Sequence, residues 1–508
     1  MLRRNKEERP NVVVLIADCL READSNTETL PFITSISDIK FTNCYSPSTW
    51  TLPSHVSLFT GTAPFEHGVT RRTKYSEQGD SIDPTQTRLP KSAKENGYTT
   101  SLFSENPYFS RRVGFDEGVD YVNDWINFKI WPSDFSATDY ISTTNPDLSE
   151  APAAAKAILA SKRPGINLLN TVWGGLRYLR GSGSSFPHQG KKVLNHIQRY
   201  LSDQEGPHLL VSNLMDTHNP HFHFPERGAE ELGVSFSSEE LEALEIASDN
   251  RMYLFPSDRR LPKQTQAYFE TWDDVFKARN DIYKSQIRHF DFLLKDWYNA
   301  VSNEFHEETL LIVTGDHGQL FGEENRAGHH TSLHPSGINV PLYISLPSGW
   351  ESQSHKISDV TSWNSLTEAV IETMDGEINT SRGFINALTN AERAVVTVDG
   401  SGYDVSEIKS DDRFDKSLVE NMIGTRKIGF VEEDSMTVYE SKWRQTSIQR
   451  HKYTIGDTSR ELKETTLEWN DCLPEDIEVW LREESHVEAS QNVASGPISD
   501  RLEALGYK

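Results

Sequence analysis

Three short, almost wholly apolar segments constrain the fold of this chain most strongly. The three segments are Asn11–Ala17, His208–Leu214 and Thr309–Thr314. Each of them is rich in Val, Ile or Leu. A continuous apolar run of this length is typical of a strand buried on both faces, as in a parallel sheet covered by helices. Segments with helical periodicity lie between them, such as Lys191–Leu201 and Asn280–Val301. The alternation predicts an α/β fold with a mostly parallel central sheet flanked by helices.

The sequence pattern changes after about residue 390. From there on, polar and apolar residues alternate in short segments such as Lys427–Val431 and His451–Ile455. Such alternation is typical of an antiparallel sheet with one face in solvent. We therefore divide the chain into a charged lead-in (1–10), a main α/β domain (11–390), a smaller subdomain with an antiparallel sheet (391–481) and a polar tail (482–508). Pro, Ser and Gly clusters within residues 120–190 predict an insertion or a lid.

The composition excludes several classes of function. The chain has 508 residues, with 51 Lys and Arg against 76 Asp and Glu, which gives a net charge of −25. So acidic a chain is a poor match for a nucleic-acid backbone, which requires a basic surface. The charge fits either a high-salt cytoplasm or an ordinary well-solvated enzyme. No run approaches the ~18 apolar residues of a membrane span. The three cysteines are too few for a disulfide framework. We expect a cytoplasmic protein, and the sequence leaves its oligomeric state open.

Polar residues follow each of the three apolar segments at once. Asp18 follows the first, Asp216 and His218 the second, and Asp316 with His317 the third. A single Asp in this position most often caps a helix or forms a turn. The carboxyl ends of parallel strands meet at one edge of a sheet, so these side chains should converge. Carboxylate and imidazole ligands together predict one divalent cation, for which Ca, Mg, Mn and Zn are all admissible.

Thr51 stands just ahead of Pro53, where a helix is expected to begin. A hydroxyl at a helix N-terminus lies in a positive field that favours an alkoxide and nearby anions. Thr51 could instead be an ordinary N-cap. The candidate cation ligands elsewhere in the sequence favour a nucleophile.

The order of these motifs resembles the sulfatase branch of the alkaline phosphatase superfamily. The first strand with Asp18, the Ser48–Gly61 segment and Glu66–Gly68 resemble its opening strand and nucleophile helix. The remaining matching motifs are Gly97–Asp116, Asp216–His218, Gly315–Gly318 and Gly328–Pro341. The resemblance covers about residues 11–375 and implies an alkaline-phosphatase-like fold.

The resemblance also implies roles for individual residues. Asp18, Asp316 and His317 would bind the cation, and Thr51 would be the nucleophile that touches it. His218 would bind the ester oxygens or protonate the leaving group. His330 stands where the family usually has a Lys that contacts the anion, and His329 competes for that role. The further substrate-contact candidates are His55, Arg21 and Arg71. The implied substrate is a small-molecule or glycan sulfate or phosphate ester.

Two departures from the family pattern affect the chemistry. Sulfatases carry Cys or Ser, oxidised to formylglycine, where this chain has Thr51; a secondary alcohol cannot give that aldehyde. Many sulfatases have a second ligating Asp where this chain has Cys19, which is either a core thiol or a ligand for a softer metal. His221 and His223 could reach a second metal or lie in an exposed loop.

Three functions remain after these observations. The first is a metal-dependent hydrolase of sulfate or phosphate esters with a Thr nucleophile. The second is a transferase of the same superfamily that moves a phospho-alcohol group to an acceptor. The third is a catalytically silent sulfatase-like binding protein, against which the grouped cation ligands argue.

Overall fold

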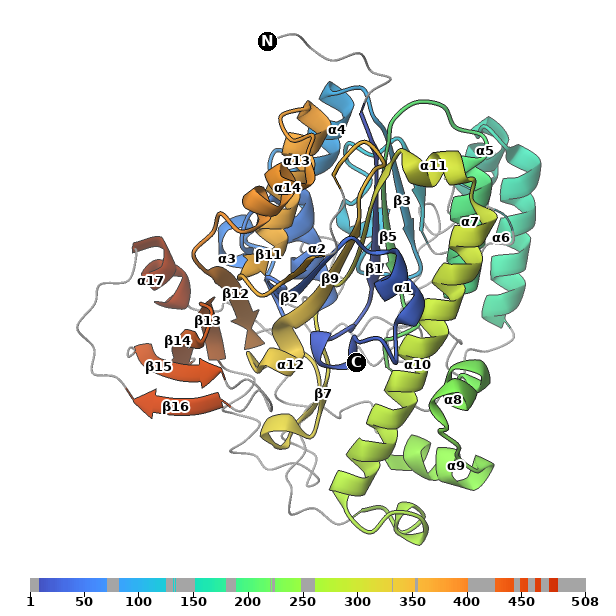
Figure 1. Cartoon of the computed structure of the whole chain (residues 1–508). Helices are drawn as coiled ribbons and strands as arrows, with labels where there is room; N and C mark the ends of the chain where they lie inside the picture. Colours follow the sequence, from blue (N-terminus) through green and yellow to red (C-terminus); the bar gives the residue numbers. More distant parts are fainter. Residues whose placement is uncertain are drawn as a thin grey trace.

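A computed structural model of the chain describes residues 9–70, 82–124, 131, 133, 151–179, 189–219, 221, 224–247, 261–330, 332–351, 355–400, 425–442, 448–455, 462–466 and 475–482. Two sheets and the helices around them make up this part of the chain (Figure 1).

The larger sheet has nine strands, in the order β10-β2-β9-β6-β1-β5-β3-β4, with β11 also paired to β2. Their bounds are β1 Asn11–Ala17, β2 Ile39–Tyr45, β3 Thr99–Ser104, β4 Tyr121–Asn123, β5 His208–Leu214, β6 Thr309–Gly315, β9 Asn339–Ser345, β10 His355–Ile357 and β11 Thr361–Ser362. Only β9 runs against its neighbours, because its pairings with β2 and β6 are antiparallel. The predicted mostly parallel central sheet is therefore confirmed.

Strand β1 lies in the middle of this sheet, parallel to both β5 and β6. Its side chains alternate between two apolar cores, with Val12, Val14 and Ile16 on one face and Val13 and Leu15 on the other. Both faces are buried, which explains why the sequence of this strand is continuously apolar.

Helices cover both faces of the sheet (Figure 1). The core on one face contains residues of α2 Thr51–Thr60, α4 Leu89–Glu95, α13 Trp363–Asp375 and α14 Ser381–Leu388. The core on the other face contains residues of α1 Pro31–Ile36, α7 Gly190–Leu201 and α10 Trp272–Ala300. The structure is thus a helix–sheet–helix sandwich, and apolar burial on both faces of β1 fixes the position of its carboxyl end.

The second sheet is antiparallel and has the strand order β12-β13-β14-β15-β16. Its strands are β12 Ala394–Asp399, β13 Thr425–Val431, β14 Ser435–Lys442, β15 Ile448–Ile455 and β16 Leu462–Thr466. Val396 and Val398 face a core that includes Tyr45 of the large sheet, while the other face packs on α17 Glu475–Arg482. The predicted C-terminal antiparallel sheet is confirmed.

The second sheet also holds the segment that leads into α2. The backbone N–H of Thr397 donates to the carbonyl of Pro47 at 2.8 Å. The Ser48 hydroxyl donates back to the carbonyl of Thr397 at 2.9 Å. These two hydrogen bonds tie β12 to the segment immediately before Thr51.

Some elements differ from the sequence prediction. Helix α10 begins at Trp272, eight residues before the predicted start at Asn280, because Thr271 and Asp274 cap it reciprocally. In the predicted insertion, the described residues 151–179 form α5 Ala151–Ala160 and α6 Pro164–Leu179. The proposed domain boundaries remain predictions, and the 482–508 tail lies almost entirely outside the described residues.

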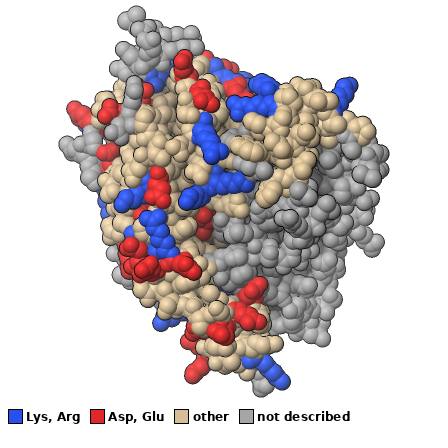
Figure 2. Space-filling view, turned by 90° about the vertical axis from the view of Figure 1, so that its right-hand side faces the viewer, with Lys and Arg blue, Asp and Glu red and all other residues tan. Residues whose placement is uncertain are grey.

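The described surface in Figure 2 shows acidic and basic side chains interspersed. No described helix is both long and apolar enough to cross a bilayer.

Helix α8 Glu226–Leu232 packs on α10 through Gly228. A Cβ at Gly228 would lie 2.1 Å from the carbonyl oxygen of Ser285. We expect Gly228→Ala to lower the free energy of unfolding by about 1–3 kcal/mol, because backbone must move to relieve this overlap. Chemical denaturation measures the change.

Gly165→Ala is the matched control, because a Cβ at this position in α6 has no neighbour within 4 Å. It should be neutral or stabilising by up to about 1 kcal/mol, since Ala is the better helix former. Equal effects of the two substitutions would contradict the described packing of α8.

Candidate active site

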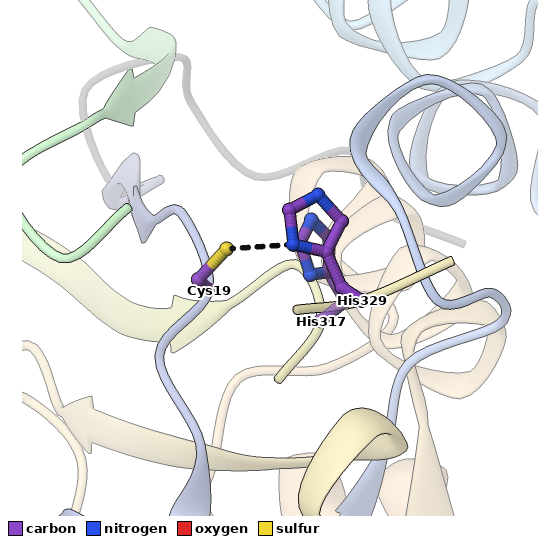
Figure 3. A group of neighbouring side chains, drawn as sticks. All are labelled: Cys19, His317 and His329. Carbon is purple, nitrogen blue, oxygen red and sulfur yellow. Dashed lines mark hydrogen bonds between the residues drawn. The ribbon is translucent and has the colours of Figure 1, made fainter. Parts of the chain in front are cut away.

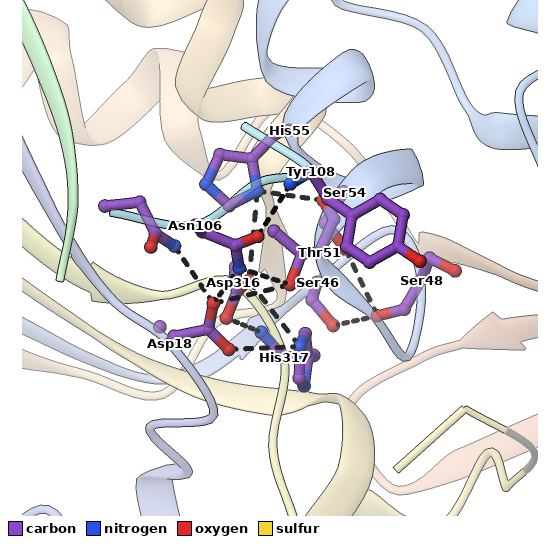
Figure 4. A network of polar contacts seen from close by, with 12 residues as sticks. Asp18, Ser46, Ser48, Thr51, Ser54, His55, Asn106, Tyr108, Asp316 and His317 are labelled. Carbon is purple, nitrogen blue, oxygen red and sulfur yellow. Dashed lines mark hydrogen bonds and ion pairs between the residues drawn. The ribbon is translucent and has the colours of Figure 1, made fainter. Parts of the chain in front are cut away.

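Strand register brings the polar residues of the sequence to one edge of the sheet. Ala17 of β1 pairs with Leu214 of β5 and with Gly315 of β6, so the three strands end at the same level. Asp18 and Asp316 are the next residues on β1 and β6. The predicted convergence of these two carboxylates is therefore present, and Figure 4 shows them together with Thr51 and His317.

Two glycines allow the Asp316–His317 loop to lie this close to its neighbours. A Cβ at Gly315 would lie 2.1 Å from the carbonyl oxygen of Leu20, and one at Gly318 would lie 1.9 Å from that of Ser336. Both contacts are with backbone, which cannot swing aside as a side chain can. Glycines on either side of the Asp-His pair are therefore required by packing.

The Asp18 carboxylate is held by two side-chain amides, one just beyond β3 and one within β5. Its Oδ2 accepts hydrogen bonds from Asn106 Nδ2 at 2.7 Å and Asn213 Nδ2 at 3.2 Å. Asn106 also donates to Thr51 Oγ1 at 3.3 Å. Sequence reasoning missed both asparagines. Asn106 lies just beyond β3, so the rule that polar residues gather beyond strand ends could have found it, whereas Asn213 lies inside β5 and carries no such signal.

Thr51 is the first residue of α2 and is fully buried. Trp50 occupies the N-cap position of this helix, and no side chain makes a capping hydrogen bond there. The Thr51 hydroxyl instead donates to Asp18 Oδ2 at 3.4 Å. The N-cap interpretation of Thr51 therefore does not hold, and its oxygen lies at the carboxylate pair.

Hydrogen bonds fix the ring tautomers of two histidines at the site. His317 Nδ1 lies 2.9 Å from the carbonyl oxygen of Gly318, and His218 Nδ1 lies 2.6 Å from that of Asn219. A carbonyl can only accept, so both Nδ1 atoms carry the proton and both Nε2 atoms carry a lone pair in the neutral rings. His317 Nε2 lies 3.6 Å from Asp18 Oδ1 and 3.5 Å from Asp316 Oδ2, and His218 Nε2 lies 3.9 Å from Asp18 Oδ1.

The charges at this site are not balanced by the described residues themselves. Burial lowers the pKa of His317 to about 4, so its ring is neutral at pH 7. Burial and the neighbouring Asp18 raise the pKa of Asp316 well above its usual range. Within the described ranges, the ion-pair partners of Asp18 and Asp316 are all histidines. Two buried carboxylates without a permanent cation are costly, and a divalent cation would remove the cost.

The donor atoms fit such a cation. The ligand atoms of Asp18, Asp316 and His317 all lie within 4.8 Å of one another. Asp316 Oδ2 and His317 Nε2 are buried and make no hydrogen bond to a described residue. Carboxylate oxygens and an imidazole nitrogen can bind several divalent metals, and Thr51 is adjacent to both carboxylates.

The other histidines predicted at the site lie around this centre. His55 is fully buried beneath Thr51, where its Nδ1 contacts the Thr51 carbonyl at 2.8 Å and lies 3.8 Å from Asp316 Oδ2. His329 packs against the ring of His317 at 4.6 Å. His330 is anchored by its backbone to the Thr49 carbonyl, two residues before the proposed nucleophile.

The remaining predicted residues lie elsewhere. Arg21 is buried in a cluster with Asp24 and Glu323, which occupies its guanidinium with ion pairs away from the carboxylate pair. His221 Nδ1 lies 2.8 Å from Gln286 Oε1. Among the described residues, His221 does not lie in any cluster of side chains that could bind a metal ion. Arg71 and His223 lie outside the described residues.

Aromatic side chains adjoin Thr51. Trp50 packs edge-on against Tyr108 at 5.5 Å and lies 5.7 Å from His330. All three are less than a tenth exposed, as is every residue of the carboxylate pair and its ligands.

Comparison with known families agrees with this arrangement. The profile of the Sulfatase family matches residues 10–376. The chain belongs to the sulfatase family. The match spans both sheet-edge carboxylates and Thr51, and no curated protein sequence matches this sulfatase-family chain.

Solved structures share the fold at low sequence identity. A phosphonate monoester hydrolase of Agrobacterium radiobacter is 15% identical, with a TM-score of 0.53, over 88% of this chain and 89% of that chain. A 2-O GAG sulfatase is 13% identical, with a TM-score of 0.54, over 88% and 85%. A third protein, solved with its substrate D-glucosamine-2-N,6-O-disulfate, is 12% identical, with a TM-score of 0.52, over 88% and 91%. These likenesses establish the shared sulfatase-like fold.

Cation binding should stabilise the protein, and Asp316→Asn should remove that effect. At a cation concentration 100 times the Kd, the wild type should gain about 2.7 kcal/mol in unfolding free energy. The variant should gain little, because it loses a ligand oxygen. Thermal or chemical unfolding after chelation, with and without added cation, measures both gains.

Asp291→Asn is the matched control. Asp291 is also buried, but its oxygens accept from the N–H groups of Phe32 and Ile33 at the start of α1. This control should be less stable than the wild type and still gain the full increment from the cation. A full gain in Asp316→Asn would contradict its role as a ligand.

Proposed function

We propose that this protein is a metal-dependent hydrolase of sulfate or phosphate esters that uses Thr51 as its nucleophile. One observation carries the proposal: the Thr51 hydroxyl lies 3.4 Å from Asp18 Oδ2, at the edge of the sheet where Asp18 and Asp316 converge from neighbouring strands. A hydroxyl in this position is adjacent to whatever cation the carboxylates bind.

The reaction follows from the placement of the chain's own groups. A bound divalent cation would lower the pKa of the Thr51 hydroxyl and offset charge on the transferring group. The Thr51 hydroxyl then loses its proton, and Thr51 Oγ forms a bond to the sulfur or phosphorus of the ester. The bond between that atom and the leaving alcohol breaks in the same step. A water molecule attacks the threonine ester in the second step, which releases sulfate or phosphate and restores the hydroxyl.

Two histidines are proposed to serve the substrate. His218 presents Nε2 toward Asp18. When its ring is protonated, Nε2 can donate a hydrogen bond to the ester oxygens or pass its proton to the leaving alkoxide. His330, next to Trp50 and anchored to Thr49, is proposed to contact the anionic group. His55 lies beneath Thr51 and is better suited to position the carboxylate than to touch a substrate.

The formylglycine mechanism does not suit this chain. Oxidation of a threonine hydroxyl gives a ketone, because the carbon that bears it also bears a methyl group. Direct attack by the Thr51 oxygen needs no modification. The named activities of the structural relatives, phosphonate monoester hydrolysis and 2-O GAG sulfatase activity, support an anionic ester as the substrate class and leave sulfur and phosphorus both open.

Thr51→Ala should abolish turnover of aryl sulfates, phosphate monoesters, phosphodiesters and phosphonates in a matched panel assayed across divalent metals. We expect a loss of at least about 1,000-fold in kcat, because no other described hydroxyl is proposed to attack. Thr51→Ser should retain measurable activity, since a primary alcohol can make the same attack.

Thr60→Ala is the control at the other end of the same helix, where the hydroxyl bonds to the Val56 carbonyl. It should leave kcat unchanged. Activity of Thr51→Ala equal to that of the wild type would remove the proposed mechanism. Adding an alcohol acceptor and analysing the products separates the two enzymatic classes, because a transferase would yield the acceptor ester in place of free sulfate or phosphate.

A further inference from the structure

Cys19 is held rigidly beside the carboxylate pair. It is fully buried, and its backbone φ of 65° lies in the left-handed region that non-glycine residues seldom adopt. Its N–H donates to Asp316 Oδ1 at 3.1 Å, and its carbonyl accepts from the Tyr283 hydroxyl at 2.7 Å. These bonds fix the direction in which the side chain leaves the backbone.

The Cys19 sulfur points at the ligand atoms of the site and not into an apolar core. Sγ lies 3.5 Å from Asp18 Oδ1 and 3.7 Å from His329 Nδ1. Figure 3 shows it facing the adjacent rings of His317 and His329. One ligand atom from each of Cys19, His317 and His329 can be chosen so that all lie within 4.8 Å of one another.

These separations match those of donors around one metal ion. Zn–S and Zn–N bonds of about 2.3 and 2.0 Å in a tetrahedral site place the donor atoms roughly 3.3–3.6 Å apart. Asp18 Oδ1 lies 3.5 Å from Cys19 Sγ and 3.6 Å from His317 Nε2. Asp18 Oδ1 therefore lies at ligand spacing from both the sulfur and the imidazole nitrogen.

The other described cysteine provides a contrast. Cys44 lies in β2 and belongs to the apolar core on one face of the sheet. It is as buried as Cys19. Burial alone thus does not distinguish Cys19; the imidazole and carboxylate donors around its sulfur do.

We propose that the Cys19 thiolate is a ligand of the cation at this site, alongside Asp18, Asp316 and His317, and that it makes the site prefer Zn²⁺ to Ca²⁺ or Mg²⁺. Sulfur and imidazole nitrogen are zinc ligands, whereas Ca²⁺ and Mg²⁺ take oxygen ligands. On binding, the thiol proton passes to solvent and a metal–sulfur bond forms. The inference deepens the proposed function and rests on its cation site.

His329 is the positioning residue for this ligand. Its Nδ1 lies 2.8 Å from Gln319 Oε1 as well as 3.7 Å from the sulfur, and its ring packs on that of His317. His329 thereby contacts both the Cys19 sulfur and the His317 ring and can hold them in place. Such outer partners orient the residues that bind a metal.

Cobalt substitution tests the proposal directly. Full-length protein is stripped with a chelator, loaded with Co²⁺ and examined by absorption spectroscopy. The wild type and Cys44→Ser should both show the near-ultraviolet band of thiolate-to-cobalt charge transfer. Cys19→Ser should lose this band while still binding Co²⁺, which the visible ligand-field bands and metal analysis report.

The outcomes separate this proposal from the function on which it rests. If wild-type protein binds Co²⁺ stoichiometrically without the charge-transfer band, the cation site stands and the thiolate ligand is overturned. A band that persists in Cys19→Ser also overturns it. Failure of the wild type to bind Co²⁺ or any other divalent cation overturns both the ligand and the proposed function.

Cys19→Asp provides a second test in case the serine variant does not fold. Asp tolerates the left-handed backbone better than most residues and supplies an oxygen ligand. Competition between Zn²⁺ and Ca²⁺, measured by calorimetry, should show the Zn²⁺/Ca²⁺ affinity ratio falling by at least about 10–100-fold, since even outer-partner changes typically cost that much. An unchanged ratio would contradict the proposal.

Discussion

The free-energy cost of burying two carboxylates side by side is the main physical constraint on this structure. Asp18 and Asp316 follow neighbouring parallel strands, and strand pairing places them at the same level of the sheet. Neither is exposed to solvent, and burial lowers the pKa of the neighbouring His317 to about 4, so that ring is neutral at pH 7. Apolar packing on both faces of β1 keeps the pair in place. We infer that the fold supplies a preformed cation site, and that the cation completes it.

The rest of the molecule secures the oxygen that this site would activate. Helix α2 starts at Thr51, and the segment before it is hydrogen-bonded to β12 of the second sheet through Pro47 and Ser48. The C-terminal sheet therefore does more than extend the molecule, because it fixes the segment just before Thr51, the proposed nucleophile. Glycines beside Asp316 and His317 let neighbouring backbone come close enough to hold their loop.

The sequence was sufficient to predict the fold class and the convergence of Asp18, His218, Asp316 and His317. Asp216 was also expected at this edge, but its carboxylate lies beside Glu105 and Gly190. Apolar strands that end abruptly in Asp or His have few explanations, and the order of the motifs supplied the rest. The features of the site that could not be predicted are those that depend on tertiary contacts. Asn213 sits within a strand and looks like any interior polar residue, and the ion pairs of Arg21 involve partners far along the chain. Cys19 had two interpretations from sequence, between which only the surroundings of its sulfur can choose.

The account depends most on an ion bound between the two carboxylates and in reach of the Thr51 oxygen. Crystals grown with Mn²⁺ or Zn²⁺ and measured at the absorption edge of the metal test this by anomalous scattering. We predict a single strong peak within bonding distance of Asp18, Asp316, His317 and the Thr51 oxygen. An anomalous map that is empty there, in crystals whose protein was saturated with the metal, would contradict the central claim.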